Sequence, residues 1–461
     1  MSRNAALFLG QDDSMDFNAV LDRVQQYLSE NYKELVNTGG QDSKPMMISH
    51  IRQYLTDNRL SVSGMSIEQL VSRLYTEMAE FSFLTPYLNY TSAEYANSSF
   101  DYIRNVEGIE ICSWDNVKVK YADGHEEPAK GGFSSAEHAR NVLTRLLHQS
   151  NITMDNTKPL VRGHLNKNIR ITVNGGGGTL DDEVGIAASI RFINPNHLTK
   201  EDLIRFGTIT PEMMDFLCAA YRYGLSMMLA GETDAGKTTL ISIIMSIAVE
   251  HSKKLYTIEN ETREFNLIVR NSLGQILNKV VHTVTRESDD PNQRITQQML
   301  LELAMTMNPD YICMAEVKGS EAFETIEAGL TGHSVIGTTH TFSCKEIPDR
   351  FVQLASLRNS NVSDKTLYEM FAKAFPILFY SENMADKVRR VTEICECQVE
   401  NGRPKVITLW EYQTDYNEVV DGKIIVHGEF VKRNAISEEL QRRLRKKGIS
   451  ETLLQSFIKE D

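Results

Sequence analysis

The chain has 461 residues, of which 41% are hydrophobic, 24% charged and 8% aromatic. This composition is typical of a globular protein and argues against intrinsic disorder. At about 100–200 residues per domain, the length excludes a single small module. The 49 Lys and Arg against 62 Asp and Glu give a formal charge of −13, which disfavours general binding to a nucleic-acid backbone.

No apolar run approaches the roughly 18–20 residues that span a bilayer, so we expect no membrane crossing. The N-terminal stretch holds only a short apolar run before its acidic residues, which is too short for a signal-peptide core, so we also expect no export. Of the six cysteines, only Cys395 and Cys397 lie close in sequence, without the second pair that a zinc site needs. We therefore expect reduced, structural cysteines in a cytosolic protein.

The first part of the chain is predicted to be helical and then mixed. From about Asp16 to Leu88 the apolar residues recur at helical spacing, which predicts a helical segment over residues 1–95. Short strand patterns and one helix then predict a small α+β domain over residues 96–195. The predicted elements of that domain are strands within 108–121, a helix at Ser135–His148, and strands near Ile169–Val173 and Ile186–Phe192.

A second domain is predicted from about residue 200, after a linker at Asn194–His197. Apolar strand patterns alternate there with helical ones, which predicts a parallel sheet covered by helices over residues 200–430, with C-terminal helices at 431–461. The predicted strands are Ser226–Ala230, Leu255–Ile258, Val280–Thr285, Tyr311–Ala315, Ser334–Thr339, Arg389–Cys397, Val406–Glu411 and Lys423–Val426. The predicted helices are Thr238–Glu250, Thr296–Met307, Ser320–Leu330, a stretch beyond Cys344, and a final helix from Ser437 to Gly448.

The strongest motif lies between the first of these strands and the helix that follows it. Residues 231–238 fit the pattern G-x-x-x-x-G-K-[ST] of a phosphate-binding loop. Glycines at both ends allow successive N–H groups to point inward, and the helix start adds partial positive charge, so the loop favours a triphosphate. Lys237 would reach the β- and γ-phosphates and the Thr238 hydroxyl would hold Mg²⁺. The predicted nucleotide contacts are Gly231, Glu232, Thr233, Asp234, Ala235, Gly236, Lys237, Thr238 and Thr239.

Two acidic residues end other predicted strands. Glu259 ends one strand and Glu316 ends another. In a parallel sheet these ends share one edge with the phosphate loop. A carboxylate at this edge can order Mg²⁺ or accept a proton from an attacking water, whereas a solvated strand-end acid is the alternative for each.

A family resemblance follows from the run Asn308–Ala322 together with Thr331–His333 and Gly337–His340. These residues resemble the secretion-motor ATPases of type II and type IV systems. More narrowly, they resemble the branch that drives tight-adherence (Flp) pilus assembly and its conjugative relatives. In that family the phosphate loop is followed by an acidic box, here Thr257–Asn260, and by a Walker B segment, here Ala315–Gly319. The resemblance covers about residues 106–396.

The resemblance implies roles for several residues. Glu316 would orient the attacking water and help to hold Mg²⁺, Glu259 would be a second acid near the γ-phosphate, and His340 would sense that phosphate. His333, of the same two-histidine box, would support the neighbouring helix, although a core or surface imidazole is the alternative for any single histidine. The family also lends arginines to the phosphates. The matching positions here are Arg170 and Arg191, for which an ordinary surface charge is the alternative, and Arg286, which could act within or across subunits.

Some positions depart from the family pattern. Asn260 replaces the usual Asp of the acidic box, and Lys318 replaces the usual Arg of the Walker B segment. Thr306 and Asn308 stand where the family carries arginines. Lys318 keeps its charge but loses the bidentate fork of arginine. These changes bear on the rate of turnover and on signalling between subunits.

The sequence therefore predicts an α/β fold with a RecA-like P-loop core, preceded by a small α+β domain and a helical segment. The resemblance implies a homo-hexameric ATPase that uses ATP and Mg²⁺ and powers pilus assembly or protein secretion by closing a cleft between the two domains. It also implies an inner-membrane platform protein as partner and a place at the inner face of the membrane. The acidic charge balance agrees with a protein partner, so we expect no direct nucleic-acid partner. The alternatives are a conjugative DNA-transfer ATPase and a nucleotide-gated scaffold with weak turnover.

Overall fold

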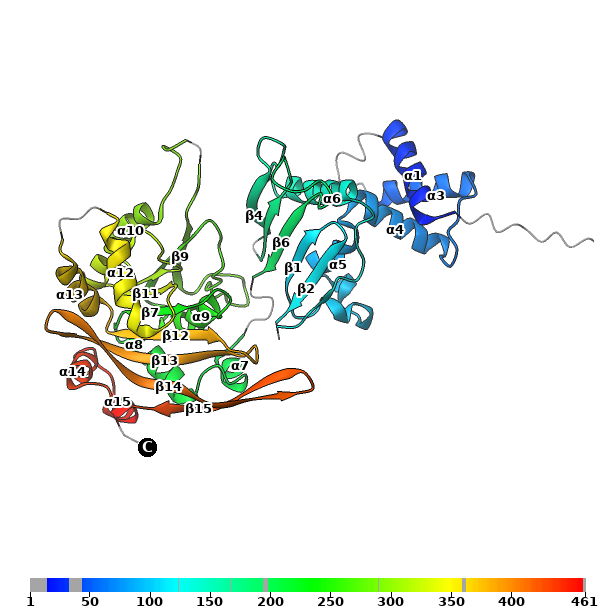
Figure 1. The fold of residues 1–461 in the computed structure, drawn as a ribbon. Helices are drawn as coiled ribbons and strands as arrows, with labels where there is room; N and C mark the ends of the chain where they lie inside the picture. The colour runs from blue at the N-terminus through cyan, green and yellow to red at the C-terminus, as the bar shows by residue number, and fades with distance from the viewer. Residues whose placement is uncertain are drawn as a thin grey trace, which may run out of the picture. The chain divides into compact units, whose positions relative to one another are not determined.

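The computed structural model describes residues 15–32, 44–122, 124–166, 168–193, 198–288, 290–358 and 362–458 (Figure 1). The N-terminal stretch before residue 15 and the expected linker Asn194–His197 lie outside these ranges. The chain divides into two compact units, one ending at Phe192 and the other beginning at Ile193. Among the described residues, no helix combines the length and apolarity needed to cross a membrane.

The first unit begins with helices that have a core of their own. Helices α1, α3 and α4 bury Val24, Ile51 and Leu74, none of which is measurably exposed. A capping box at Ser66 and Gln69 fixes the start of α4, because each residue accepts a backbone N–H of the other. The helices of this unit are α1 (Phe17–Asn31), α3 (Lys44–Asp57), α4 (Ile67–Ala79), α5 (Thr85–Leu88) and α6 (Ala136–Gln149), with 3₁₀ turns at Ser82–Leu84, Ala93–Tyr95 and Ser98–Ile103.

The rest of the first unit is an antiparallel sheet with the strand order β3-β2-β1-β6-β5-β4. Alternating apolar residues such as Ile109, Ile171 and Ile190 point to one face, where they pack against Val142 and Leu143 of α6. The opposite face is polar and carries both predicted arginines. The strands are β1 (Val106–Ser113), β2 (Asn116–Tyr121), β3 (Glu126–Pro128), β4 (Leu160–Asn166), β5 (Ile169–Asn174) and β6 (Ala187–Phe192).

The second unit is built on a nine-stranded sheet of order β15-β14-β13-β12-β7-β11-β10-β8-β9. All pairings from β12 to β9 in this order are parallel, and β12 to β15 pair antiparallel. The strands are β7 (Met227–Gly231), β8 (Lys254–Glu259), β9 (Lys279–Val284), β10 (Tyr311–Met314), β11 (Ser334–Thr339), β12 (Ile377–Asn383), β13 (Arg389–Glu400), β14 (Arg403–Val420) and β15 (Lys423–Lys432). The carboxyl ends of the parallel strands therefore share one edge.

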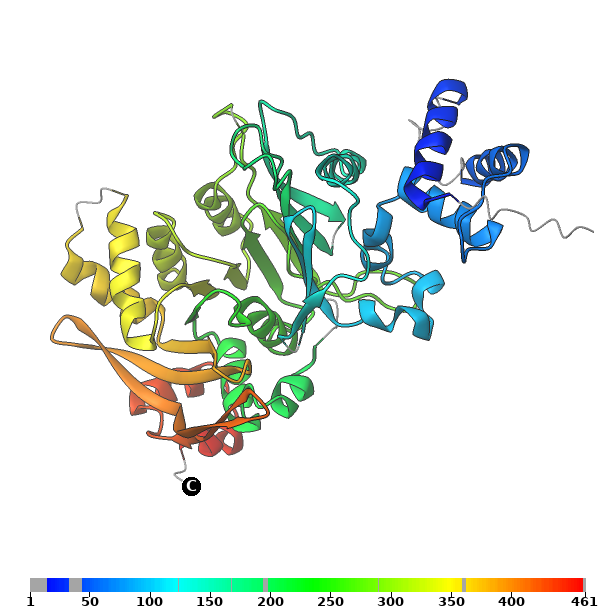
Figure 2. The ribbon, with the colours of Figure 1, turned by 45° about the vertical axis from the view of Figure 1, so that its right-hand side comes forward.

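Helices cover both faces of this sheet (Figure 2). One core packs α8, α9, α14 and α15 against the sheet, and the other packs α10 to α13 against its opposite face. Such two-sided coverage explains why the inner parallel strands β7, β8, β10 and β11 are almost continuously buried and do not alternate. The helices are α7 (Lys200–Arg205), α8 (Pro211–Arg222), α9 (Lys237–Ala248), α10 (Gln297–Thr306), α11 (Ala322–Leu330), α12 (Ile347–Ser356), α13 (Asp364–Ala374), α14 (Glu438–Lys446) and α15 (Glu451–Ile458), with a 3₁₀ turn η5 (Cys344–Glu346).

This architecture confirms the predicted fold class, an α/β fold with a RecA-like P-loop core and a mostly parallel sheet. The sheet differs from the sequence prediction in one strand that was not predicted and in the lengths of two others. Strand β12 lies at the centre of the sheet beside β7, yet the sequence pattern does not predict it, because a short continuous apolar run cannot be told from a buried helical segment by periodicity. Strands β14 and β15 are longer than the predicted Val406–Glu411 and Lys423–Val426, because they form one long hairpin in which β14 runs to Val420 and β15 to Lys432.

Candidate functional site

The phosphate-loop motif connects the buried strand β7 to helix α9. Gly231 ends the strand, and a Cβ added there would lie 2.2 Å from the carbonyl oxygen of Ser381, so the close approach of β12 requires glycine. Gly236 has a φ of +76°, a left-handed conformation that glycine adopts at little cost, and α9 begins at the next residue. The local structure therefore follows the strand–loop–helix order in which such a motif binds phosphate.

The loop is braced by the neighbouring strands. The Ser381 hydroxyl of β12 donates to the carbonyl oxygen of Ala235 at 2.7 Å. Arg389, the first residue of β13, donates from Nε to the Asp234 carbonyl at 2.9 Å and from Nη2 to the Asp234 carboxylate at 2.8 Å. Sequence reasoning missed both bracing residues, because each lies about 150 positions from its partner and β12 itself was not predicted.

Lys237 is the first residue of α9, and its side chain folds back onto the loop. Its ammonium group donates to the carbonyl oxygens of Gly231 at 2.8 Å and Glu232 at 2.6 Å, and it lies 3.5 Å from Nδ1 of His340. The residue is only 9% exposed, so its charge lies inside the loop. Thr238 and Thr239 follow in the first turn of α9 and are half-buried.

His340 connects the phosphate loop to Glu316. Its Nε2 lies 3.0 Å from Oε1 of Glu316, and the second carboxylate oxygen lies 3.2 Å from Nζ of Lys318. Because Nδ1 faces the Lys237 ammonium group, which can only donate, we assign a ring proton to Nε2, which faces Glu316. The hydrogen bond from His340 and the charge of Lys318 lower the pKa of Glu316 to about 2. The carboxylate is therefore fully ionised at neutral pH.

Glu316 is also positioned through its backbone. The side-chain amide of Gln297, at the start of α10, donates to the Glu316 carbonyl oxygen at 2.8 Å. Gln297 is 7% exposed, and nothing in the sequence signals this contact. An ionised carboxylate and a threonine hydroxyl at the same sheet edge are hard oxygen ligands, so Glu316 and Thr238 fit the magnesium site that the motif predicts.

Glu259 has a different environment from Glu316. It ends β8, is 1% exposed, and its Oε2 accepts the backbone N–H groups of Glu264 and Phe265, the latter at 2.9 Å. Its Oε1 has no hydrogen-bond partner and lies 3.9 Å from Nδ1 of His282. Burial raises the pKa of Glu259 to about 7 and lowers the pKa of His282 to about 4. Glu259 thus fixes the loop that follows β8.

His333 and Arg286 have no hydrogen bond or ion pair with Lys237, His340 or Glu316 among the contacts of the described residues. His333 precedes β11 and His340 follows it, so the two histidines are at opposite ends of a strand and about 20 Å apart. Nδ1 of His333 lies 2.9 Å from the carbonyl oxygen of Pro309. This contact connects the turn before β11 to the turn before β10. Arg286 is exposed in the loop after β9, where its Nε donates to the Gln293 carbonyl at 2.7 Å.

Arg170 and Arg191 belong to the first unit. They are register partners on β5 and β6, so their side chains are cross-strand neighbours on the polar face of that sheet. Arg191 is exposed and Arg170 is half-buried. The structure therefore brings together Lys237, His340 and Glu316 in one unit and the two arginines in the other.

The positions that depart from the family pattern also have defined contacts. Lys318 forms the ion pair with Glu316 described above. The side-chain nitrogen of Asn260 is buried without a hydrogen-bond partner. The Thr306 hydroxyl donates to the carbonyl oxygen of Leu303 at the end of α10, and Asn308 adopts a left-handed φ of +50° in the turn before β10.

Comparison with known proteins gives relatives along most of the chain. An uncharacterized protein of Methanocaldococcus jannaschii is 31% identical over 196 residues, which cover 42% of this chain and 68% of that protein. A putative conjugal transfer protein of Mycobacterium tuberculosis is 26% identical over 286 residues, which cover 60% of this chain and 77% of that protein. Among solved structures, the Legionella pneumophila ATPase DotB aligns with a TM-score of 0.47 and 14% identity over 76% of this chain and 82% of its own.

A family model described as type II/IV secretion system protein matches residues 136–456. This match begins at α6 of the first unit, includes the phosphate loop, His340 and Glu316, and ends within α15. Since it spans well over half of the chain, the chain belongs to the type II/IV secretion system protein family.

Proposed function

We propose that this protein is an ATP-hydrolysing motor that powers pilus assembly or protein secretion. The observation that carries the proposal is the continuous contact from Lys237 to His340 and from His340 to Glu316, at 3.5 Å and 3.0 Å, on the edge of the sheet that bears the phosphate loop. Anion-binding, phosphate-sensing and water-orienting groups then meet at one place. Membership of the type II/IV secretion system family supports the same function.

The geometry suggests how each group would act on ATP. The loop amides and Lys237 bind the β- and γ-phosphates. With a pKa of about 2, Glu316 is too weak a base to remove a proton at neutral pH, so it orients the attacking water through its negative charge. Mg²⁺ held near Thr238 and Glu316 would neutralise the charge that develops on the phosphate oxygens. His340, between Lys237 and Glu316, would report whether the γ-phosphate is present.

The remaining predicted site residues have less direct proposed roles. Glu259 is a second acid that acts near the γ-phosphate by positioning the loop after β8. Arg170, Arg191 and Arg286 supply positive charge to the phosphates within or across subunits. His333 supports the turn before β11 and acts only indirectly on the reaction.

At the level of the assembly, we propose a homo-hexameric ring of the tight-adherence pilus branch, in which ATP turnover closes the first unit against the second. A ring is needed because one isolated subunit has no neighbour on which to do directional work. The ring would bind an inner-membrane platform protein at the inner face of the cell membrane. The formal charge of −13 favours a protein cargo over a nucleic acid.

The test is release of phosphate from ATP and Mg²⁺ by the purified full-length chain, with and without single- or double-stranded DNA. We expect release that DNA does not change. Strong stimulation by DNA that weakens with salt would instead support a conjugative DNA-transfer ATPase, the alternative favoured by the conjugal transfer relative. ATP binding without measurable release would support a nucleotide-gated scaffold.

A further inference from the structure

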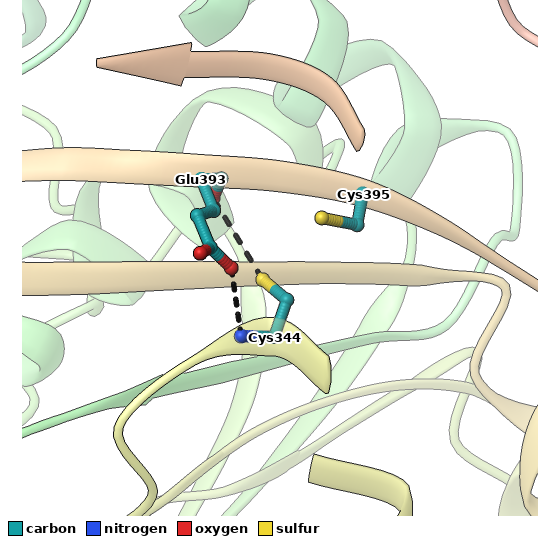
Figure 3. A group of neighbouring side chains, drawn as sticks. All are labelled: Cys344, Glu393 and Cys395. Atoms are coloured by element: carbon teal, nitrogen blue, oxygen red, sulfur yellow. Dashed lines mark hydrogen bonds between the residues drawn. The ribbon is translucent and has the colours of Figure 1, made fainter. Parts of the chain in front are cut away.

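Three side chains that can bind metal meet in the second unit, and none of them belongs to the Lys237–His340–Glu316 group. They are the thiols of Cys344 and Cys395 and the carboxylate of Glu393, and one ligand atom from each lies within 4.8 Å of the other two (Figure 3). Cys344 begins η5, whereas Glu393 and Cys395 are two residues apart on β13 and so share one side of that strand. The sequence does not reveal the cluster, because 49 positions separate Cys344 from Glu393.

Hydrogen bonds already hold the ligand groups in place. The backbone N–H of Cys344 donates to Oε2 of Glu393 at 2.8 Å, which fixes the carboxylate beside the sulfur (Figure 3). The Cys344 thiol lies 4.0 Å from the Glu393 carbonyl oxygen, and the Cys395 thiol lies 3.9 Å from the hydroxyl of Thr408. Cys344 is 0% exposed and Cys395 is 1% exposed, whereas Glu393 is half-buried. An ion would therefore enter from the side of the carboxylate.

We propose that Cys344, Cys395 and Glu393 bind one thiophilic divalent cation of the zinc type, with a water as the fourth ligand. A tetrahedral ion with metal–sulfur bonds of about 2.3 Å spaces its ligand atoms by roughly 3.8 Å, so the observed cluster needs only a small contraction. On binding, each thiol releases its proton to solvent and forms one metal–sulfur bond, with no change of oxidation state. Sulfur ligands disfavour Mg²⁺, so this site is chemically distinct from the one that serves ATP.

The site would connect two segments whose residues contact the phosphate loop. Cys344 lies four positions after His340, and Glu393 lies four positions after Arg389, which holds the phosphate loop through Asp234. A bound ion would cross-link the segment after β11 to β13 and so stiffen both supports. The proposal rests only on the three ligands and does not depend on the proposed motor function.

The test uses the reduced full-length protein, stripped with a chelator and titrated with Co²⁺ as a spectroscopic probe. We expect one Co²⁺ per chain, with near-ultraviolet sulfur-to-cobalt charge-transfer bands and visible bands of tetrahedral coordination that Zn²⁺ removes. C344S and C395S should lose the charge-transfer bands, and E393Q should keep them with at least tenfold weaker affinity. C112S is the matched control, because Cys112 is exposed in the first unit and should leave the bands unchanged.

A second measurement separates loss of binding from loss of folding. Zn²⁺ should raise the thermal unfolding temperature of the parent protein relative to the chelator-treated sample, because an ion that binds only the folded state stabilises it. The C344S/C395S double variant, if folded, should show no such rise. The proposal would be overturned if the reduced parent protein gives no charge-transfer bands, or if C344S and C395S bind Co²⁺ as the parent does.

Discussion

At the residue scale, the candidate site depends on what surrounds each ionisable group. Glu316 is partly open to solvent and pairs with His340 and Lys318, so its charge is stabilised. Glu259 is enclosed and has one carboxylate oxygen without a partner, so its charge is destabilised. Glu259 ends β8 and Glu316 lies two residues after the neighbouring strand β10, yet the pKa of Glu316 is about 2 and that of Glu259 about 7. Their chemical roles therefore differ.

Lys237 should be required for binding of ATP. Replacing it by Ala removes the ammonium group that donates to the loop carbonyl oxygens and lies beside His340, and with it the positive charge expected to contact the phosphates. We expect K237A to weaken ATP binding at least tenfold, measured by fluorescence of a labelled nucleotide or by calorimetry. K253A, on the exposed turn before β8, is the matched control and should bind as the parent does. Unchanged affinity of K237A would contradict the loop assignment.

Glu316 should be required for hydrolysis but not for binding. Gln is nearly isosteric and retains an oxygen that can accept the hydrogen bond of His340, but it lacks the charge that orients water. We therefore expect E316Q to bind ATP with little change and to lose phosphate release about 100-fold or more. E302Q, on α10, serves as the control. Persistent release by E316Q would show that another group orients the water.

Glu259 and His282 should have opposite effects on the pH dependence of stability. Between about pH 4.5 and 6.5 the unfolded chain carries a charged Glu and a protonated His, whereas the folded pair holds its proton on Glu259, with pKa values of about 7 and about 4. On folding, the proton that the histidine carries in the unfolded chain is replaced by one on Glu259, so there is no net proton uptake. The two effects on the pH dependence of stability therefore cancel. In E259Q only His282 remains, so stability should fall as pH is lowered from about 6.5 to 4.5.

The check is the thermal unfolding temperature of parent and E259Q across that pH range. As the pH falls, the unfolding temperature of E259Q should drop increasingly below that of the parent protein. H282N should behave in the opposite way. Its stability should fall as the pH rises from about 4.5 to 7, because only Glu259 then titrates differently in the folded and unfolded states. Parallel curves for parent and E259Q would mean that Glu259 is not protonated in the folded protein.

At the scale of elements, the phosphate loop is supported from the side by β12 and β13. Ser381 donates a hydrogen bond to the Ala235 carbonyl oxygen, and Arg389 donates to both the carbonyl oxygen and the carboxylate of Asp234. Asp234 itself has a left-handed φ of +68°, which is uncommon for a residue other than glycine. These contacts to neighbouring strands help to hold that conformation.

Arg389 should therefore affect nucleotide affinity without being part of the reaction. Removing its two charge-assisted hydrogen bonds frees the loop, and we expect R389A to weaken ATP binding by about three- to tenfold. R389K keeps the charge but not the planar guanidinium group, so its affinity for ATP should lie between those of R389A and the parent. The measurement is the same binding titration, with R403A on β14 as control. Equal affinities for R389A and the parent would show that the loop keeps its shape without this brace.

At the scale of the whole molecule, the two units carry complementary parts of the proposed motor. The second unit holds the loop, His340 and Glu316, and the first presents Arg170 and Arg191 on the polar face of its sheet. In the proposed ring, the phosphates of ATP would bind these arginines as groups of opposite charge.

The ring proposal makes a direct prediction about mass. E316Q with ATP and Mg²⁺ should form a hexamer in native mass spectrometry or analytical ultracentrifugation, because ATP that is bound but not hydrolysed keeps the subunits in one state. R170A/R191A should keep binding ATP but form less hexamer. A species that remains monomeric at every protein and nucleotide concentration would contradict the ring, while leaving the nucleotide-binding results intact.

The sequence alone determined the phosphate loop, the acids at the strand ends and the α/β class, because these depend on local spacing: glycines at fixed positions, apolar strands, and helices with recognisable starts. It also brought Glu316 and His340 to the sheet edge, since parallel strands align their carboxyl ends. Tertiary structure alone decided the central place of β12, the contacts of Ser381 and Arg389 with the phosphate loop, and the meeting of Cys344 with Cys395. Those contacts join residues far apart in the chain, and side-chain pairing at such range leaves no periodic signal in the sequence.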